Sequence, residues 1–309
     1  MRIYVVGSGA IGSYFGGHLV RDGNDVTFLG RGVHLDALRK QGLSVQTMTD
    51  TIRLESVQTI ESTSEITKPD LIFFCVKTYS TETVAKTLAS VVSDNTTIIT
   101  LQNGVENDVR VKAFVPNAAV YPGNTLIACR RPEPGVVRQT GGPGKLLFGN
   151  PTGGENKQLK TIEQLLLRAG INAVYSDDIL RDLWKKFILI TAFGGLTALC
   201  RAPIGVILTN SASRQLYERC VRETIDVALR RRVRLPHDVF EHVIQSSEAF
   251  LDTPQKAASQ SSLLVDLESG SETEIETING TVVRMAEDYG VDVPVNSAIY
   301  AGVKLASAD

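Results

Sequence analysis

The chain has 309 residues, of which 43% are hydrophobic and 21% charged, as in an ordinary soluble globular protein. The formal net charge of −2 excludes a general attraction to nucleic acid or to an acidic membrane surface. No signal peptide is apparent, and the longest apolar stretch, 187–200, is shorter than the roughly 18 residues of a membrane span, so we expect a cytoplasmic protein. The four cysteines lack CxxC spacing, and we expect neither disulfides nor a bound metal.

The first half of the chain alternates between apolar runs and helical patterns. Weak alternation over 43–57 indicates a hairpin or an edge pair of strands. The predicted strands are 3–6, 25–29, 71–77 and 96–104, and the predicted helices are 11–21, 34–41, 81–92 and one that ends at 111. This alternation predicts parallel βαβ units in a Rossmann-type, doubly wound α/β sheet.

The pattern changes after residue 118. Residues 119–149 combine glycine and proline with short β runs, which indicates antiparallel strands that close the sheet, and a helix at 156–169 and a strand at 171–175 complete the domain. Farther on, apolar residues recur at three- and four-residue spacing, as in helices. We therefore predict an NADP-binding Rossmann-like domain at 1–176 and an all-helical substrate and catalytic domain at 177–309.

A glycine-rich turn separates the first strand from the first helix. In the pattern G-x-G-x-x-G, the first glycine permits a tight turn, the second lets a pyrophosphate approach the backbone, and the third lets helix and strand pack closely. The start of the helix offers unpaired N–H groups to the phosphates. The alternative is a glycine turn without a ligand. The predicted cofactor contacts here are Gly7, Ser8, Gly9, Ala10, Ile11 and Gly12.

The residues at the end of the second predicted strand indicate whether the dinucleotide is NAD or NADP. Sites for NAD usually carry an acidic residue there, which binds the ribose 2′-hydroxyl. Here the sequence is VTFLGRG, and Arg31 stands 19 residues after Gly12 with no acidic residue beside it. A guanidinium can bind a 2′-phosphate, so we expect NADPH as the cofactor. The alternative is that Arg31 is a solvated loop residue.

Six segments of the chain resemble the ketopantoate reductase family (2-dehydropantoate 2-reductases) in order and spacing, nearly from end to end. The resemblance implies a Rossmann domain, a helical C-terminal domain, a cleft between them, and hydride transfer from NADPH to a 2-keto acid, as in pantothenate biosynthesis. The segments are GSGAIGSYFG, FLGRGVHLDALRKQGL, FFCVKTYST, LQNGVEND, LWKKF…GGLTAL and TEIETINGTVV…GVDVPVNSAIY.

The resemblance implies that Lys186 is the general acid of the reaction. Hydride arriving at a ketone carbon builds negative charge on the oxygen, and a donor must stabilise that charge and supply a proton. A lysine can do both if partial burial lowers its pKa. Lys186 precedes the apolar run 187–193, whereas its neighbour Lys185 could face water instead.

The remaining implied site residues come from both predicted domains. Lys77 and Asn103 match positions near the nicotinamide and its ribose, and they follow strands whose carboxyl ends face the cofactor in such sheets. Asn103 also matches a catalytic and substrate-binding position. Glu274 matches a carboxylate shared by cofactor and substrate, Ser262 a hydroxyl that contacts the substrate, and Ala128 a cofactor contact.

Three positions depart from the family pattern. The family usually has asparagines where this chain has Ile190, Gly194 and Ile204. Ketopantoate carries a hydroxyl and a carboxylate, and a buried polar group without a hydrogen bond costs about 1–3 kcal/mol. We therefore keep two interpretations: the substrate is a more apolar 2-keto acid or ketone, or other side chains supply the missing hydrogen bonds.

Two further alternatives stay open. A non-catalytic NADP(H)-binding sensor would keep the glycines and Arg31 but would not need Lys186. The sequence does not decide the oligomeric state, and a homodimer stays open. The four histidines show no metal-ligand spacing, and we expect structural or surface roles for them.

Overall fold

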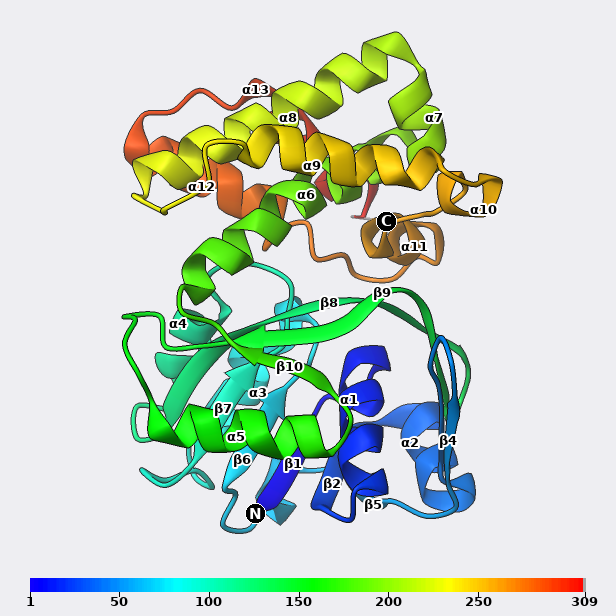
Figure 1. The fold of residues 1–309 in the computed structure, drawn as a ribbon, viewed down its shortest axis with the longest axis vertical. Helices are drawn as coiled ribbons and strands as arrows, with labels where there is room; N and C mark the ends of the chain where they lie inside the picture. Colours follow the sequence, from blue (N-terminus) through cyan, green and yellow to red (C-terminus); the bar gives the residue numbers. More distant parts are fainter. Residues whose placement is uncertain (308–309) are drawn as a thin grey trace. The chain divides into compact units, whose positions relative to one another are not determined.

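The computed structural model describes residues 1–307, which form two compact units (Figure 1). The sheet unit comprises Met1–Gln102 and Glu106–Ile179, and the helical unit comprises Asn103–Val105 and the chain from Leu180 onward. The predicted fold class, a Rossmann-type sheet followed by an all-helical region, is confirmed.

The sheet unit is built on one mixed sheet with the strand order β4-β3-β9-β8-β7-β6-β1-β2-β5, and β10 pairs with β9. The strands are β1 (Arg2–Val6), β2 (Asp25–Leu29), β3 (Leu43–Gln46), β4 (Thr51–Leu54), β5 (Gln58–Ile60), β6 (Leu71–Phe74), β7 (Thr97–Thr100), β8 (Ala119–Glu133), β9 (Val136–Phe148) and β10 (Asn172–Tyr175). The strands β5, β2, β1, β6, β7 and the start of β8 are parallel, and β8 then pairs antiparallel with β9. The predicted strands 71–77 and 96–104 end earlier than expected, at Phe74 and Thr100.

Helices cover both faces of this sheet. They are α1 (Ala10–Arg21), α2 (Gly32–Gln41), α3 (Thr81–Leu88), α4 (Asn107–Lys112) and α5 (Lys157–Arg168), with short 3₁₀ turns at η1 (Thr63–Glu65) and η2 (Thr78–Ser80). Along β1, Ile3 and Val5 enter the core shared with α1, α2 and α5, whereas Tyr4 and Val6 enter the core shared with α3 and α4. A strand buried on both faces reads as a continuous apolar run, which is what the sequence shows here.

Helix α1 lies unusually close to the strands around it (Figure 1). A Cβ added at Gly16 would lie 2.4 Å from the ring of Phe28, and one at Gly17 would lie 2.6 Å from the side chain of Val45. Glycine inside a helix costs about 1 kcal/mol relative to alanine, and the close packing explains why both are present.

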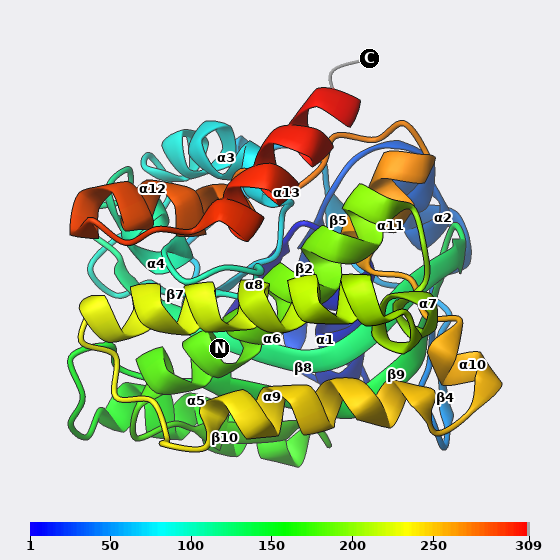
Figure 2. The ribbon, with the colours of Figure 1, turned by 90° about the horizontal axis from the view of Figure 1, so that it is seen from above.

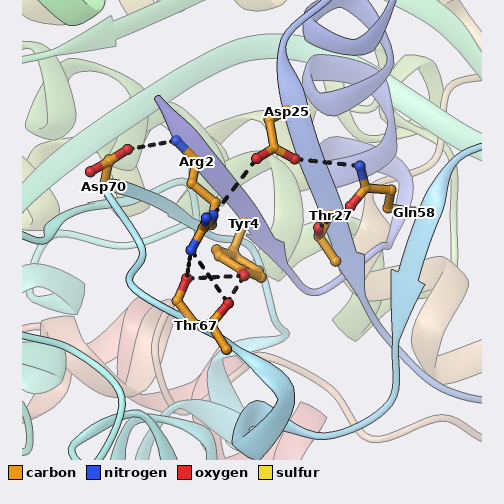
Figure 3. Close-up of polar contacts among 7 residues, drawn as sticks. All are labelled: Arg2, Tyr4, Asp25, Thr27, Gln58, Thr67 and Asp70. Carbon is orange, nitrogen blue, oxygen red and sulfur yellow. Dashed lines mark hydrogen bonds and ion pairs between the residues drawn. The ribbon is translucent and has the colours of Figure 1, made fainter.

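Polar side chains tie the amino ends of the central strands together (Figure 3). The backbone N–H of Arg2 donates to the Asp70 carboxylate at 2.6 Å, and the Arg2 guanidinium donates to the Thr67 carbonyl at 2.7 Å. Asp25 completes the cluster by an ion pair with Arg2 and by a hydrogen bond from Gln58. This edge of the sheet is therefore occupied by contacts within the protein, and the opposite, carboxyl edge carries the candidate site.

The helical unit packs around α6, whose residues Ile188, Ala192 and Leu196 are fully buried. Figure 2 shows α8 running beside α9, with α12 and α13 on its other side. Its elements are α6 (Ile179–Cys200), α7 (Ile204–Thr209), α8 (Ser211–Arg230), α9 (Val239–Glu248), η3 (Ala249–Leu251), α10 (Pro254–Ala257), α11 (Ser262–Glu268), α12 (Asn279–Tyr289) and α13 (Pro294–Ala306).

Within residues 1–307, α6 is the one helix whose length and composition would let it cross a membrane. It is longer than the apolar stretch read from the sequence, because it begins at Ile179. Of its most apolar window, 61% is buried inside the protein, and its apolar residues pack against α8, α11 and α13. This is the behaviour of the central helix of a packed core.

Two of the four histidines are buried. His18 and His34 are 6% and 3% exposed, whereas His237 and His242 are exposed. Burial lowers the pKa of both buried rings from 6.5 to about 4, and the positive charges of Arg21 (for His18) and Arg131 (for His34) act in the same direction.

These depressed pKa values predict an acid-sensitive fold. Each buried histidine stays neutral in the folded protein at a pH where the same residue is protonated in the unfolded chain. Its contribution to the free energy of unfolding is therefore complete above about pH 6.5 and is lost as the pH falls toward 4. Between pH 7 and pH 5 we expect the free energy of unfolding to fall by about 2 kcal/mol for each buried ring, measured by urea denaturation. His34→Gln should make this fall smaller by about 2 kcal/mol, and His237→Gln should not change it. An equal fall in both variants would contradict the assignment.

Candidate active site

The turn between β1 and α1 is held by its own backbone. The N–H groups of Gly7 and Ser8 both donate to the Leu29 carbonyl at 3.0 Å, so the turn lies against the end of β2. Gly7 has φ +101°, and a Cβ there would lie 2.7 Å from the Cys75 backbone. A Cβ at Gly12 would lie 2.2 Å from the Gly7 carbonyl oxygen. The fold itself therefore requires the first and third glycines of the motif.

The second glycine differs from the other two. A Cβ at Gly9 would have no atom of the protein within 4 Å, and Gly9 has φ −69°, which any residue adopts. It is the N-cap of α1, and no side chain caps this end of the helix. Open space beside uncapped N–H groups fits the approach of a phosphate to the backbone.

Arg31 is the N-cap of α2 and is exposed. No hydrogen bond or ion pair of its side chain occurs within residues 1–307. The neighbouring Gly30 faces the turn so closely that a Cβ there would lie 2.0 Å from the Ser8 hydroxyl oxygen. The guanidinium thus belongs to a segment that directly contacts the glycine-rich turn.

The carboxyl ends of β6 and β7 are joined by Gln102, which the sequence analysis missed. Its side-chain amide donates to the Val76 carbonyl and to the Thr81 hydroxyl, both at 2.8 Å. Gln102 is 7% exposed and lies directly before Asn103, while Val76 lies directly before Lys77. Lys77 and Asn103 lie in the loops that follow the two strands rather than at the strand ends themselves. A glutamine two residues after the end of a buried strand was the available signal.

In the helical unit, the two adjacent lysines of α6 differ in their exposure to solvent. Lys185 is exposed and Lys186 is half-buried. Burial lowers the pKa of Lys186 from 10.5 to about 8, against the opposing effect of the Glu274 carboxylate, whose charge favours the protonated amine. The residue implied as the general acid is therefore the less exposed of the two lysines, and burial lowers its pKa.

Glu274 is also distinct from its acidic neighbours. It is 7% exposed, whereas Glu268, Glu272 and Glu276 are exposed, and Glu276 forms an ion pair with Lys304 at 2.6 Å. A buried carboxylate whose charge acts on a half-buried amine favours a functional pair over a pair formed for solubility.

A buried amide holds the segment of Glu274 against α6. The Asn279 side-chain amide donates to the Thr191 carbonyl on α6 at 3.1 Å and to the side-chain oxygen of Asn296 at 3.0 Å. Gly195 makes this possible, because a Cβ there would lie 2.9 Å from the Asn279 side chain. The turn from Glu274 to Ile278 therefore has a fixed position beside the helix that carries Lys186.

Two other predicted contacts are exposed. Ser262 is the first residue of α11, while its neighbour Ser261 is the buried N-cap, which accepts hydrogen bonds from the Leu264 N–H and the Thr197 hydroxyl. Ala128 is an exposed residue of β8 that faces Gly141 of β9 across the ladder.

The three residues that stand where the family usually has asparagine differ in their surroundings. Ile190 and Gly194 follow Lys186 at four-residue spacing, and they therefore share one face of α6. Ile190 is half-buried, and the nearest atom to a Cβ at Gly194 is in Leu263, 4.0 Å away. Ile204 is fully buried in the core of the helical unit.

Two family models match the chain over most of its length. The family model "Ketopantoate reductase PanE/ApbA" matches residues 3–153, and the model "Ketopantoate reductase PanE/ApbA C terminal" matches residues 178–307. The chain belongs to the ketopantoate reductase family. As a ketopantoate reductase family member, it is an oxidoreductase of a family that uses NAD(P)H.

Individual relatives cover the whole chain. The 2-dehydropantoate 2-reductase of Pyrococcus horikoshii is 31% identical over 98% of this chain and 97% of its own length. The crystal structure of a PanE/ApbA family ketopantoate reductase from Ralstonia eutropha JMP134 is 28% identical, with a TM-score of 0.90 over 99% of this chain and 98% of that chain. The structure of D-mandelate dehydrogenase with NADH and anilino(oxo)acetate is 25% identical, with a TM-score of 0.87 over 99% and 98%.

The glycines of the turn allow a matched pair of variants. Gly9→Ala should leave the free energy of unfolding unchanged within about 0.5 kcal/mol, because its Cβ enters open space, but should weaken binding of the NAD(P)H cofactor at least about tenfold. Gly12→Ala should lower the free energy of unfolding by at least about 2 kcal/mol, because its Cβ meets backbone. Fluorescence titration and urea denaturation measure the two effects. Wild-type cofactor affinity in Gly9→Ala would contradict a phosphate at this position.

Proposed function

We propose that this protein reduces a 2-keto acid to the corresponding 2-hydroxy acid with NADPH, and that ketopantoate is the substrate. The observation that carries the proposal is the half-burial of Lys186 on α6 together with the burial of Glu274, whose charge raises the lysine pKa while burial lowers it. The relative from Pyrococcus horikoshii named above supports ketopantoate as the substrate. A sensor that only binds the cofactor would not need this pair.

In the proposed reaction, the bound nicotinamide supplies a hydride to the carbonyl carbon of the substrate. Negative charge then develops on the carbonyl oxygen, and the Lys186 ammonium stabilises this charge and donates a proton from Nζ to the oxygen. The products are the 2-hydroxy acid, the oxidised cofactor and a neutral lysine amine, which takes up a proton from solvent. Glu274 keeps the amine protonated before the reaction, since its negative charge raises the lysine pKa.

The remaining residues orient the reactants in this proposal. Arg31 binds the 2′-phosphate of NADPH, and the turn with Gly9 binds the pyrophosphate. Lys77 and Asn103 lie near the nicotinamide and its ribose, and Gln102 fixes both loops through its two hydrogen bonds. Ser262 contacts the substrate, and Ala128 contacts the cofactor.

A second candidate substrate is a 2-keto acid with an apolar side chain. Ile190 and Gly194 supply no hydrogen bond where the family usually has asparagines, and Gly194 leaves space beside Leu263. The similarity to D-mandelate dehydrogenase supports this candidate, because that protein binds an aromatic 2-oxo acid derivative in its structure. A cytoplasmic location and a homodimer remain predictions.

The two lysines of α6 provide a matched test of the mechanism. Lys186→Ala should lower kcat by about 10²- to 10⁴-fold while NADPH still binds, and Lys185→Ala should leave kcat near the wild-type value. Because the acid must be protonated, we expect kcat/KM of the wild type to be level below pH 8 and to fall about tenfold per pH unit above it. Wild-type turnover in Lys186→Ala would remove this residue from its proposed role.

The substrate is tested by steady-state oxidation of NADPH with a panel of 2-keto acids. If ketopantoate is the substrate, its kcat/KM should exceed those of phenylglyoxylate and of branched-chain 2-keto acids by at least about tenfold. The reverse order would favour the apolar candidate, and Gly194→Asn should then lower activity on phenylglyoxylate. No turnover of any keto acid, with tight NADPH binding, would favour the sensor.

A further inference from the structure

The turn of the β8–β9 hairpin is fastened to the start of α2. The backbone N–H of Gly135, in this turn, donates to Nδ1 of His34 at 3.1 Å. A Cβ at Gly135 would lie 3.4 Å from the Cβ of Ala37, so the turn packs directly on the helix. The hairpin turn therefore contacts α2, the helix whose N-cap is Arg31.

The same histidine connects the hairpin to the glycine-rich turn. Since Nδ1 accepts a hydrogen bond, the neutral ring carries its proton on Nε2, which lies 3.3 Å from the Ser13 hydroxyl. That hydroxyl donates to the Ser8 carbonyl at 2.9 Å. The histidine is 3% exposed and Ser13 is fully buried. A continuous row of buried contacts thus runs from the hairpin to the proposed phosphate-binding turn.

Arg131 lies on this hairpin, four residues before Gly135. The preceding Arg130 faces Arg138 across the ladder, and both are exposed. The β8–β9 ladder shifts its register between Arg130 and Glu133, so Arg131 lies in an irregular part of the hairpin, close to its turn. Its positive charge helps to lower the pKa of the His34 ring, the same ring that accepts the hydrogen bond from the hairpin turn.

Neither Arg131 nor Arg31 has an anionic partner in the part of the chain that the structure describes. Both are exposed, and neither forms a hydrogen bond or an ion pair there. Glu133 and Asp36, the acidic residues closest to them in sequence, form no ion pair with them. Other arginines of the sheet unit, such as Arg2, do pair with a carboxylate. Two unpaired guanidinium groups near a glycine-rich turn favour an anionic ligand with phosphate groups.

We propose that Arg131 binds a phosphate group of the dinucleotide, so that arginines from two separate elements, α2 and the β8–β9 hairpin, hold the phosphates. The proposal rests on the proposed use of a nicotinamide dinucleotide. The ligand chemistry is a phosphate, and the cofactor offers two sources: the pyrophosphate, and the 2′-phosphate that only NADPH carries. His34 keeps the hairpin, and with it Arg131, beside the glycine-rich turn.

The test compares the dissociation constants of NADPH and NADH for four proteins: the wild type, Arg131→Ala, Arg131→Lys and Arg130→Ala. Arg131→Ala should weaken NADPH binding by about tenfold or more, because a hydrogen bond to a charged group is lost. Arg131→Lys should lie between this variant and the wild type, since it keeps the charge but not the planar fork. Arg130→Ala removes the neighbouring exposed guanidinium, which faces Arg138 across the ladder, and should bind as the wild type does.

The NADH measurements identify the phosphate. An equal loss for NADH and NADPH assigns Arg131 to the pyrophosphate, and a loss confined to NADPH assigns it to the 2′-phosphate. Wild-type affinity of Arg131→Ala for both cofactors, with an unchanged melting temperature, would overturn the proposal. Arg31→Ala tests the proposed NADPH preference separately. If the wild type binds NADPH and NADH equally and Arg31→Ala changes neither affinity, the NADPH preference is wrong. The role of Arg131 is then still decided by the affinities of Arg131→Ala.

Discussion

The proposed chemistry depends on one amine whose partial burial is opposed by the charge of one buried carboxylate. Lys186 lies on α6, the central helix of the helical unit, and burial disfavours its charged form while Glu274 favours it. The balance leaves a pKa of about 8, so the amine is mostly protonated at neutral pH and yet gives up its proton more readily than an exposed lysine. The packing of α6 against the turn of Glu274, through Asn279 and Gly195, serves to hold this pair.

The sheet unit meets a different physical constraint, which is close approach between backbone segments. Gly7 and Gly12 allow β1, α1 and β6 to meet with almost no space between them, and only Gly9 faces open space. At the amino edge of the sheet, the polar contacts around Arg2 use the available donors and acceptors within the protein (Figure 3). At the carboxyl edge, the uncapped start of α1 and the unpaired Arg31 leave donors for a ligand. The two edges thus differ in how far their polar groups are satisfied by contacts within the protein.

Much of this could be predicted from the sequence, because the signals were local. The βαβ alternation, the glycine motif and the helical C-terminal half follow from periodicity and spacing, and the structure confirms the fold class. Other features depend on contacts between residues far apart in the chain. The family resemblance pointed to Lys186 and Glu274, but the half-burial of Lys186 next to the exposed Lys185, and the burial of Glu274 among exposed acidic neighbours, depend on the packing of the helical unit. The link from His34 to Gly135 spans 101 residues and left no pattern in the sequence.

The most direct measurement of the central claim is the titration of Lys186 itself. In protein labelled with ¹³C at the lysine ε-carbon, the Lys186 resonance can be assigned by its absence from Lys186→Ala and followed from pH 6 to 11. The account predicts a midpoint near 8 for Lys186 and a lower midpoint in Glu274→Gln, because the carboxylate that favours the charged amine is removed. A midpoint near the ordinary value of 10.5, unchanged in Glu274→Gln, would contradict the account.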